Sequence, residues 1–117
     1  SGMSDGFAIN DNVRYVVDQT NPGAATLTDA YTVPAGTKLL FNFVVANRSA
    51  VATSLRFSIA IAAAADSNEQ YVAYDLPIAG NDVYESPMFK ANATDVLRVY
   101  ATLATLSFTI SGDLKPL

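Results

Sequence analysis

The chain alternates large apolar residues with small or polar ones over several short segments. The clearest of them are residues 39–45, 55–61 and 105–111. In each, the large apolar side chains fall mainly on one parity and the polar or small ones on the other. This period of two is typical of a β-strand with one face in a core and one face toward solvent. The pattern therefore predicts half-buried strands.

Turn signals separate these segments. Asn21-Pro22-Gly23 and Pro34-Ala35-Gly36 combine the fixed φ of Pro with a Gly that permits positive φ. The predicted strands are residues 12–18, 27–33, 37–47, 51–62, 70–76, 83–90, 96–102 and 106–111. We expect 37–47 to form an antiparallel hairpin with 51–62, and 96–102 to pair with 106–111.

Two prolines and two tyrosines give further expectations. Pro77 is expected to break the strand over residues 70–76, and Pro87 makes 83–90 a weak edge strand, because Pro lacks a backbone donor. Tyr71 and Tyr74 fall on opposite parities, so simple alternation places them on opposite faces of their strand.

Seven to eight short strands without a long amphipathic helix indicate an all-β fold. We predict an antiparallel β-sandwich and leave open whether its strand order is jelly-roll or Ig-like. The predicted core consists of the large apolar residues in phase with one another: Leu39, Phe41, Phe43, Val45, Leu55, Phe57, Ile59, Ile61, Val99, Leu106, Phe108 and Ile110.

With 117 residues the chain has room for one domain. Residues 1–2, ahead of Met3, are typical of a cloning remnant. Residues 3–11 are interpreted as an N-terminal arm, 12–113 as the sandwich and 114–117 as a C-terminal tail. The start shows no basic region followed by an apolar stretch, so we expect no secretory signal.

Composition favours a protein that assembles with others. Half of the residues are hydrophobic and only 15% are charged, against about 25% in typical domains. Other subunits are expected to cover part of such a surface. The net charge is −4 and the basic residues do not cluster in sequence, so no nucleic-acid partner is expected. No apolar run reaches transmembrane length, so no membrane partner is expected either.

The chain contains no His, Cys or Trp. Acid–base catalysis would depend on carboxylate pairs such as Asp66/Glu69 or Asp82/Glu85, which lie in predicted loops where charges are normally solvated. Zinc and other transition metals lack imidazole and thiolate ligands. The run from Asp66 to Glu69 lacks the spacing of a calcium loop, so we interpret it as a polar turn. We expect no enzyme activity, catalytic residue, cofactor or metal.

Six tyrosines raise an alternative function. Sandwich domains bind sugars by stacking aromatic rings against them, and Trp, the preferred ring, is absent here. We therefore favour core packing or subunit contacts for the tyrosines. A receptor- or carbohydrate-binding module of a tail fibre or surface protein stays open as the alternative.

An ordered series of motifs gives a family resemblance. It begins with residues 31–37 (YTVPAGT) and 46–50 (ANRSA), continues with 74–78 (YDLPI) and 95–101 (DVLRVYA), and ends with 106–112 (LSFTISG). In order and spacing this series resembles the small β-sandwich virion structural proteins of tailed bacteriophages, which are accessory components of the head or tail.

The resemblance implies a non-enzymatic virion protein, made in the host bacterial cytoplasm, that binds other virion proteins and copies of itself. Its location in head or tail stays open. Loops and free ends carry function on a rigid scaffold, so the expected partner contacts lie in one turn, one loop and the arm: Asn47, Arg48, Ser49, Asp66, Asn68, Glu69, Phe7 and Ile9.

Overall fold

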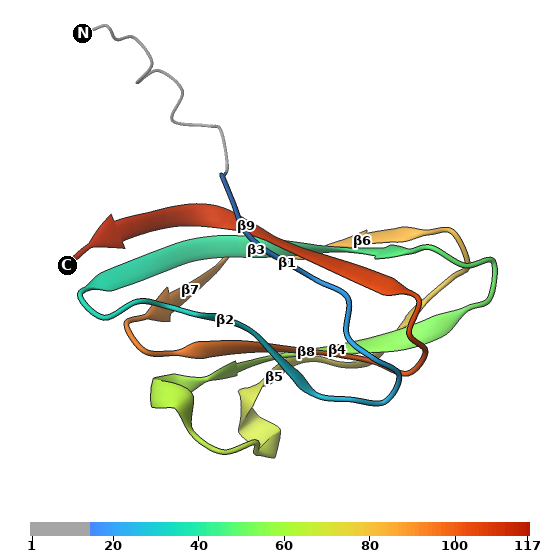
Figure 1. Cartoon of the computed structure of the whole chain (residues 1–117), viewed down its shortest axis with the longest axis horizontal. Coiled ribbons are helices and arrows are strands. Elements are labelled where there is room, and N and C mark those ends of the chain that lie inside the picture. Colours follow the sequence, from blue (N-terminus) through green and yellow to red (C-terminus); the bar gives the residue numbers. More distant parts are fainter. Residues whose placement is uncertain (1–14) are drawn as a thin grey trace, which may run out of the picture.

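The structure is a computed structural model that describes residues 15–117, and these residues form an antiparallel β-sandwich (Figure 1). The predicted fold class is confirmed. The strands number nine rather than seven to eight: β1 Tyr15–Thr20, β2 Thr28–Thr32, β3 Thr37–Asn47, β4 Thr53–Ala60, β5 Tyr71–Ile78, β6 Val83–Glu85, β7 Phe89–Asn92, β8 Val96–Ala101 and β9 Leu106–Pro116.

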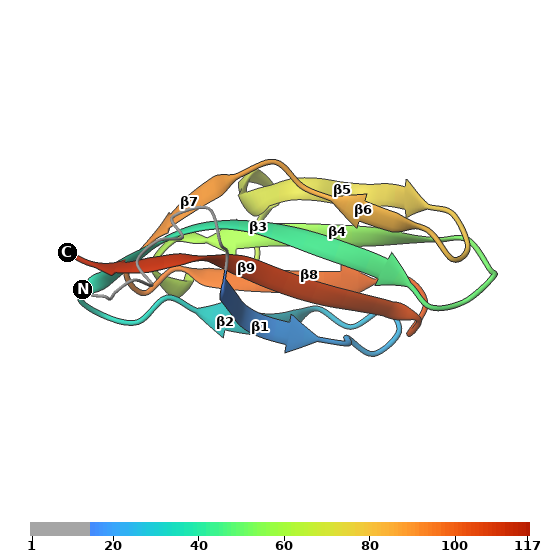
Figure 2. The same cartoon turned by 90° about the horizontal axis from the view of Figure 1, so that it is seen from above.

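The strands form two sheets that face each other (Figures 1 and 2). The first sheet has the order β1-β9-β3-β6, with β7 also paired to β3, and we call it sheet A. The second has the order β2-β8-β4-β5, and we call it sheet B. Two 3₁₀ turns, η2 Ile61–Ala63 and η3 Asn68–Gln70, lie between β4 and β5.

The core lies between the inner faces of the sheets. Of the predicted core residues, all except Ile59 and Ile61 are buried. Ile59 is half-buried and packs against the core. Val33, Leu97 and Ala101 are also fully buried. Alternation along the chain therefore located most of the core correctly.

The prediction was wrong for Ile61, which is 71% exposed. β4 ends at Ala60, and Ala62 and Ala63 then adopt left-handed φ values of 53° and 60°. The alternation of faces stops where the chain leaves the extended conformation. Ser58 falls on the polar parity of residues 55–61 and is nevertheless fully buried, because the chain from residue 61 to 70 folds back beneath sheet B (Figure 1).

Neither predicted hairpin forms, because β3–β4 and β8–β9 each cross from one sheet to the other. β3 pairs with β9 from Thr37↔Pro116 to Asn47↔Leu106. β4 pairs with β5 and β8 in sheet B. Periodicity shows which face of a strand is dry, and a sandwich offers a dry face on both sheets. It therefore cannot identify the partner strand.

The predicted strand over residues 83–90 is divided into β6 and β7 at Ser86-Pro87. Ser86 N donates to Phe43 O at 2.9 Å, and Phe43 N donates to the Ser86 hydroxyl at 2.8 Å. The serine therefore keeps this part of β3 paired where the ladder is interrupted. Pro77 does not break its strand as predicted: it lies within β5, an edge strand where a missing donor is tolerated.

The predicted C-terminal tail, residues 114–117, belongs largely to the sheet. β9 continues to Pro116, and Leu117 N donates to Gly36 O at 2.9 Å. The predicted arm over residues 3–11, with Phe7 and Ile9, lies outside the described residues.

Candidate functional site

One buried side chain organises the loops at one end of the sandwich. Asn47, at the end of β3, is 3% exposed. Its Nδ2 donates to Val51 O at 2.9 Å and to Ala79 O at 3.2 Å, and its Oδ1 accepts from Ser49 N and Thr105 Oγ1, both at 3.1 Å. Both amide protons and both acceptor positions are thus used. Asn47 joins the β3–β4, β5–β6 and β8–β9 loops.

Further contacts fix the same three loops. Arg48 N donates to Thr105 O at 2.9 Å, and Arg48 Nη2 donates to Ala104 O at 3.2 Å. Asn81 N donates to Ser49 O at 2.8 Å. These bonds come from loops far apart in sequence, so this end of the sandwich is held as one unit.

We call this surface the Asn47 end. It carries exposed apolar side chains: Val51 and Val83 are each 58% exposed, and Leu103 is also exposed. Arg48 is the exposed cation beside them. The predicted contacts Asn47, Arg48 and Ser49 do lie together here. Asn47, however, is a buried anchor and cannot itself touch a partner.

The predicted contacts Asp66, Asn68 and Glu69 lie in the segment between β4 and β5, at the other end of β4. Asp95 holds this segment: its Oδ1 accepts from Ala62 N at 3.0 Å and its Oδ2 accepts from Asn92 N at 2.8 Å. The predicted contacts in the described chain therefore form two separate surfaces.

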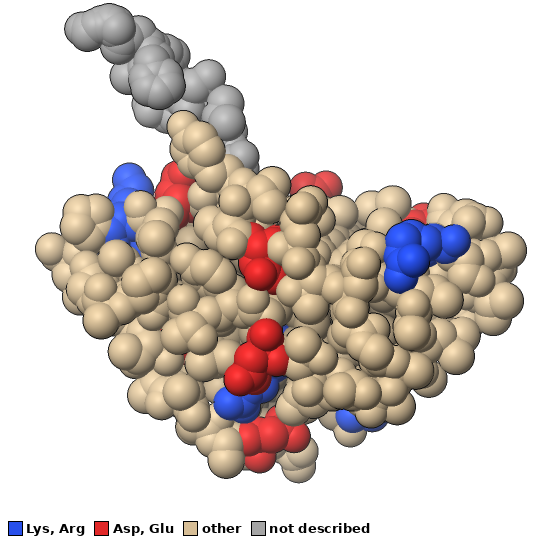
Figure 3. All heavy atoms as spheres, viewed as in Figure 1, with Lys and Arg blue, Asp and Glu red and all other residues tan. Residues whose placement is uncertain are grey.

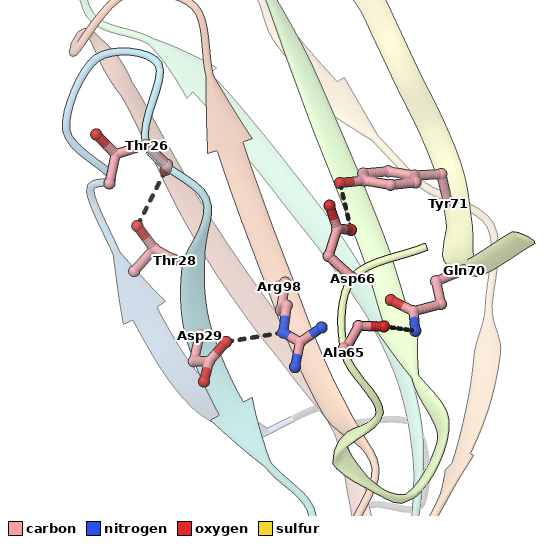
Figure 4. A network of polar contacts seen from close by, with 8 residues as sticks. All are labelled: Thr26, Thr28, Asp29, Ala65, Asp66, Gln70, Tyr71 and Arg98. Carbon is pink, nitrogen blue, oxygen red and sulfur yellow. Dashed lines mark hydrogen bonds and ion pairs between the residues drawn. The ribbon is translucent and has the colours of Figure 1, made fainter. Parts of the chain in front are cut away.

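The carboxylates of this segment are bound to neighbouring hydroxyls. Tyr71 Oη donates to Asp66 Oδ1 at 2.8 Å (Figure 4). Ser67 Oγ donates to Glu69 Oε2 at 2.8 Å and lowers the pKa of Glu69. Within residues 15–117 no group of three or more acidic, His or Cys side chains could hold a metal ion.

An aromatic cluster lies beside this segment on the outer face of sheet B. The Tyr71 and Tyr74 rings meet edge to face, with centroids 5.1 Å apart. The guanidinium carbon of Arg56 lies 4.1 Å from the Tyr74 centroid and 4.4 Å from the Tyr100 centroid. Arg56 Nε also lies 2.7 Å from Asp75 Oδ1. Cation–π contacts and an ion pair thus fix the arginine between two rings.

The prediction that Tyr71 and Tyr74 lie on opposite faces was wrong. β5 shifts register twice against β4, where Leu55 pairs with Leu76, Phe57 with Ala73 and Ser58 with Tyr71. Each extra residue on β5 is a bulge that reverses the alternation of faces. The bulge between Tyr71 and Ala73 is the one that lies between the two tyrosines, so the alternation is reversed once and both rings meet on one surface.

Asn68, Tyr71 and Tyr74 line an open hollow of about 420 Å³. Tyr74 is 57% exposed. Burial, with a contribution from the Asp66 hydrogen bond, raises the pKa of Tyr71 to about 12. Its hydroxyl therefore stays protonated at neutral pH, and the hollow offers two aromatic rings beside an amide.

The inner side of the 61–70 segment is polar. Gln70 Nε2 donates to Ala65 O at 2.8 Å, and Arg98 Nε lies 2.9 Å from Asp29 Oδ1 (Figure 4). Ser58 Oγ, Gln70 Oε1 and Arg98 Nη1 are buried without a hydrogen-bond partner in the described part of the chain.

Much of the visible surface is uncharged, with acidic and basic side chains in scattered spots (Figure 3). Among residues 15–117, no helix is long and apolar enough to span a membrane. Sequence reasoning missed Arg56 and Tyr100 as parts of the aromatic cluster. Arg56 and Tyr100 are far apart in sequence, and the pairing of β4 with β8 places them opposite each other.

Comparison of the chain with family models, characterised proteins and solved structures gives no match.

Proposed function

We propose that the protein is a non-enzymatic structural protein of a bacteriophage virion, made in the host cytoplasm, that acts by binding other virion proteins and copies of itself. The family-like series of motifs suggests the virion. The Asn47 end suggests how the protein binds.

The observation that carries the proposal is the exposure of Val51 and Leu103 on loops joined by hydrogen bonds, and of Val83 at the start of β6 beside them. Exposed apolar side chains on a fixed framework lose little conformational entropy on association. Exposed apolar surface is typical of protein–protein contacts. The occupant we propose is a neighbouring virion subunit, including a second copy of this chain.

Analytical ultracentrifugation tests self-association. We expect the wild-type protein to associate at micromolar concentrations and the double variant Val51→Asp/Leu103→Asp to sediment as a monomer. Ile61→Asp is the control, because it places a negative charge on an exposed apolar residue beyond the opposite end of β4. A wild-type protein that stays monomeric at high micromolar concentration would contradict self-association.

The virion assignment has its own test. Sequencing of the DNA around the coding gene is expected to reveal capsid, portal or tail genes. Mass spectrometry of purified particles should then detect the protein. A neighbourhood of metabolic genes without virion genes would count against the assignment and leave the association experiment unaffected.

The aromatic cluster favours a second candidate function, a receptor- or carbohydrate-binding module. Tyr71 and Tyr74 present ring surface to a hollow whose third lining residue, Asn68, can both donate and accept hydrogen bonds. Sugars combine apolar ring faces with hydroxyl groups, so this mixture of aromatic and amide groups suits them.

A glycan array distinguishes the second candidate from the first. If the cluster binds sugars, Tyr74→Ala should abolish the signal. Tyr15→Ala should retain it, because Tyr15 is an equally exposed tyrosine on β1 in the other sheet. Absence of binding by the wild-type protein to any glycan would remove this candidate.

A further inference from the structure

All three lysines of the chain surround one hollow on the outer face of sheet A. Lys38, Lys90 and Lys115 come from β3, β7 and β9 and line a space of about 230 Å³, together with Leu39, Leu40, Ala91, Asn92 and Asp113. We call this space the lysine hollow. Sheet pairing brings together cations that are far apart in sequence.

The strand register explains the arrangement. Lys38 lies opposite Lys115 on one side and Asn92 on the other. Two positions further along β3, Leu40 lies between Lys90 and Asp113. Across the three strands, one row therefore reads Asn92, Lys38 and Lys115, and the next row reads Lys90, Leu40 and Asp113. The apolar side chain of Leu40 lies in the middle of the second row.

This gathering of positive charge is unfavourable for the protein alone. Like charges directly opposite each other on neighbouring strands are destabilising, and Lys38 and Lys115 are such a pair. The chain carries eleven acidic residues and a net charge of −4, yet among the described residues Asp113 is the one acidic residue that lines the hollow.

The ammonium groups are available to a ligand. Among the described residues, the two sheet-face arginines, Arg56 and Arg98, form ion pairs with Asp75 and Asp29, whereas none of the three lysines forms one. All three lysine side chains are exposed. Each ammonium group brings three hydrogen-bond donors and no acceptor, so the hollow matches a ligand that only accepts.

We infer that the lysine hollow binds the phosphate group of a small organic phosphate ester. A phosphate presents several anionic acceptor oxygens, which suits a hollow lined by lysines from three neighbouring strands. The apolar Leu40 and the lysine stems provide contact for the organic part. The volume is below the roughly 300 Å³ at which pockets for drug-sized ligands begin, so the ligand is small. This site is independent of the function proposed above.

NMR titration of the full chain with phenyl phosphate tests the site. We expect saturable shifts of the backbone amides of residues 38–40, 90–92 and 113–115, with a dissociation constant on the order of 1 mM, as suits so small a ligand. Inorganic phosphate should shift the same amides with weaker affinity, because it makes no contact with Leu40. Equal affinity for phenyl phosphate and inorganic phosphate would overturn the role given to Leu40.

Charge variants distinguish the hollow from general electrostatics. Each of Lys38→Met, Lys90→Met and Lys115→Met should weaken phenyl phosphate binding about tenfold, the usual effect of one charge-assisted hydrogen bond. Gln19→Glu, on β1 of the same sheet, changes the net charge by the same amount and should alter affinity less than twofold. Equal losses for Gln19→Glu and the lysine variants would overturn the proposal.

Asp113→Asn gives a result that misfolding cannot imitate. Removing the carboxylate that faces the ligand should tighten binding severalfold, and the gain should shrink as salt screens the charges. Unchanged or weaker binding would contradict the placement of the phosphate over this hollow. Binding of a DNA duplex much more tightly than phenyl phosphate would contradict a small-molecule ligand.

Discussion

The ring of Phe43 on β3 stacks on the ring of Phe57 on β4, with centroids 3.9 Å apart and planes only 2° from parallel. The two strands belong to different sheets, so this contact joins the layers of the sandwich. Phe41 packs beside it, with its centroid 6.1 Å from that of Phe57. Phe57 therefore links both sheets through two aromatic neighbours.

We expect Phe57→Ala to reduce the free energy of unfolding by about 3–5 kcal/mol, because it leaves a cavity between the sheets. Urea denaturation followed by circular dichroism measures the loss. Ile61→Ala, at a largely exposed residue, is the control and should change stability by less than about 0.5 kcal/mol. A loss below about 1 kcal/mol for Phe57→Ala would contradict its place in the core.

Gly112 allows β9 to approach β3 closely. A Cβ at this residue would lie 2.0 Å from Leu40 O and 2.8 Å from Phe41 Cα. Gly112→Ala should therefore separate the strands and destabilise the protein by about 1–3 kcal/mol or more.

Thermal and urea unfolding test the role of Gly112 against Gly23→Ala. At Gly23 a new Cβ would approach no atom closer than the Thr26 hydroxyl at 3.6 Å. That substitution should be nearly neutral. Equal losses for the two variants would show that the close strand approach is not the cause.

Asn47→Ala should destabilise the Asn47 end, because it leaves the carbonyl groups of Val51 and Ala79 and the amide of Ser49 without their partner. Each lost hydrogen bond of this partly buried kind costs about 0.5–1.5 kcal/mol. Hydrogen exchange should speed up in all three joined loops. Faster exchange in the β3–β4 loop alone would contradict the view that one side chain holds the three together.

We expect the free energy of unfolding to fall at high pH because of the Tyr71 hydroxyl. Its pKa is raised from 10.0 to about 12 in the folded protein. The folded chain thus holds this proton over a pH range where the unfolded chain releases it, and the stabilisation is lost as pH rises from about 10 through about 12. Phenolate absorbance should show one tyrosine titrating near the top of this range.

The variant Tyr71→Phe isolates this effect. We expect its stability to fall less steeply with pH than that of the wild-type protein over the same range, as measured by urea denaturation. Asp66→Asn should weaken the slope only in part, because burial is the larger cause of the shift. Identical pH profiles for wild type and Tyr71→Phe would contradict the assignment.

Sequence patterns predicted the faces of the strands better than their partners. The bounds of β3 agree with the predicted strand over residues 37–47, because eleven alternating residues define both its phase and its length. Ile61 was misplaced where backbone geometry changed without a Gly or Pro to signal it. Alanines at positive φ carry no sequence signature of that conformation.

The candidate surfaces could be predicted only where their residues are consecutive in the sequence. The turn over residues 47–50 was identified from its own residues. The aromatic cluster depends on the β5 bulge between Tyr71 and Ala73, and the lysine hollow depends on the pairing of β3 with β7 and β9. Both surfaces depend on how distant strands pair and in which register. The alternation of residues within one strand carries no information about that pairing.

The position of β9 between β1 and β3 also constrains the order in which the protein can fold. During synthesis, β9 leaves the ribosome after every other strand described here. Until then β1 lacks β9, its partner among the described strands, and the edge of β3 that β9 will occupy stays open along its whole length. Such distant pairing slows folding, and an open strand edge can pair with another chain. A nascent chain that has not yet reached residue 106 should therefore be the form most prone to aggregate.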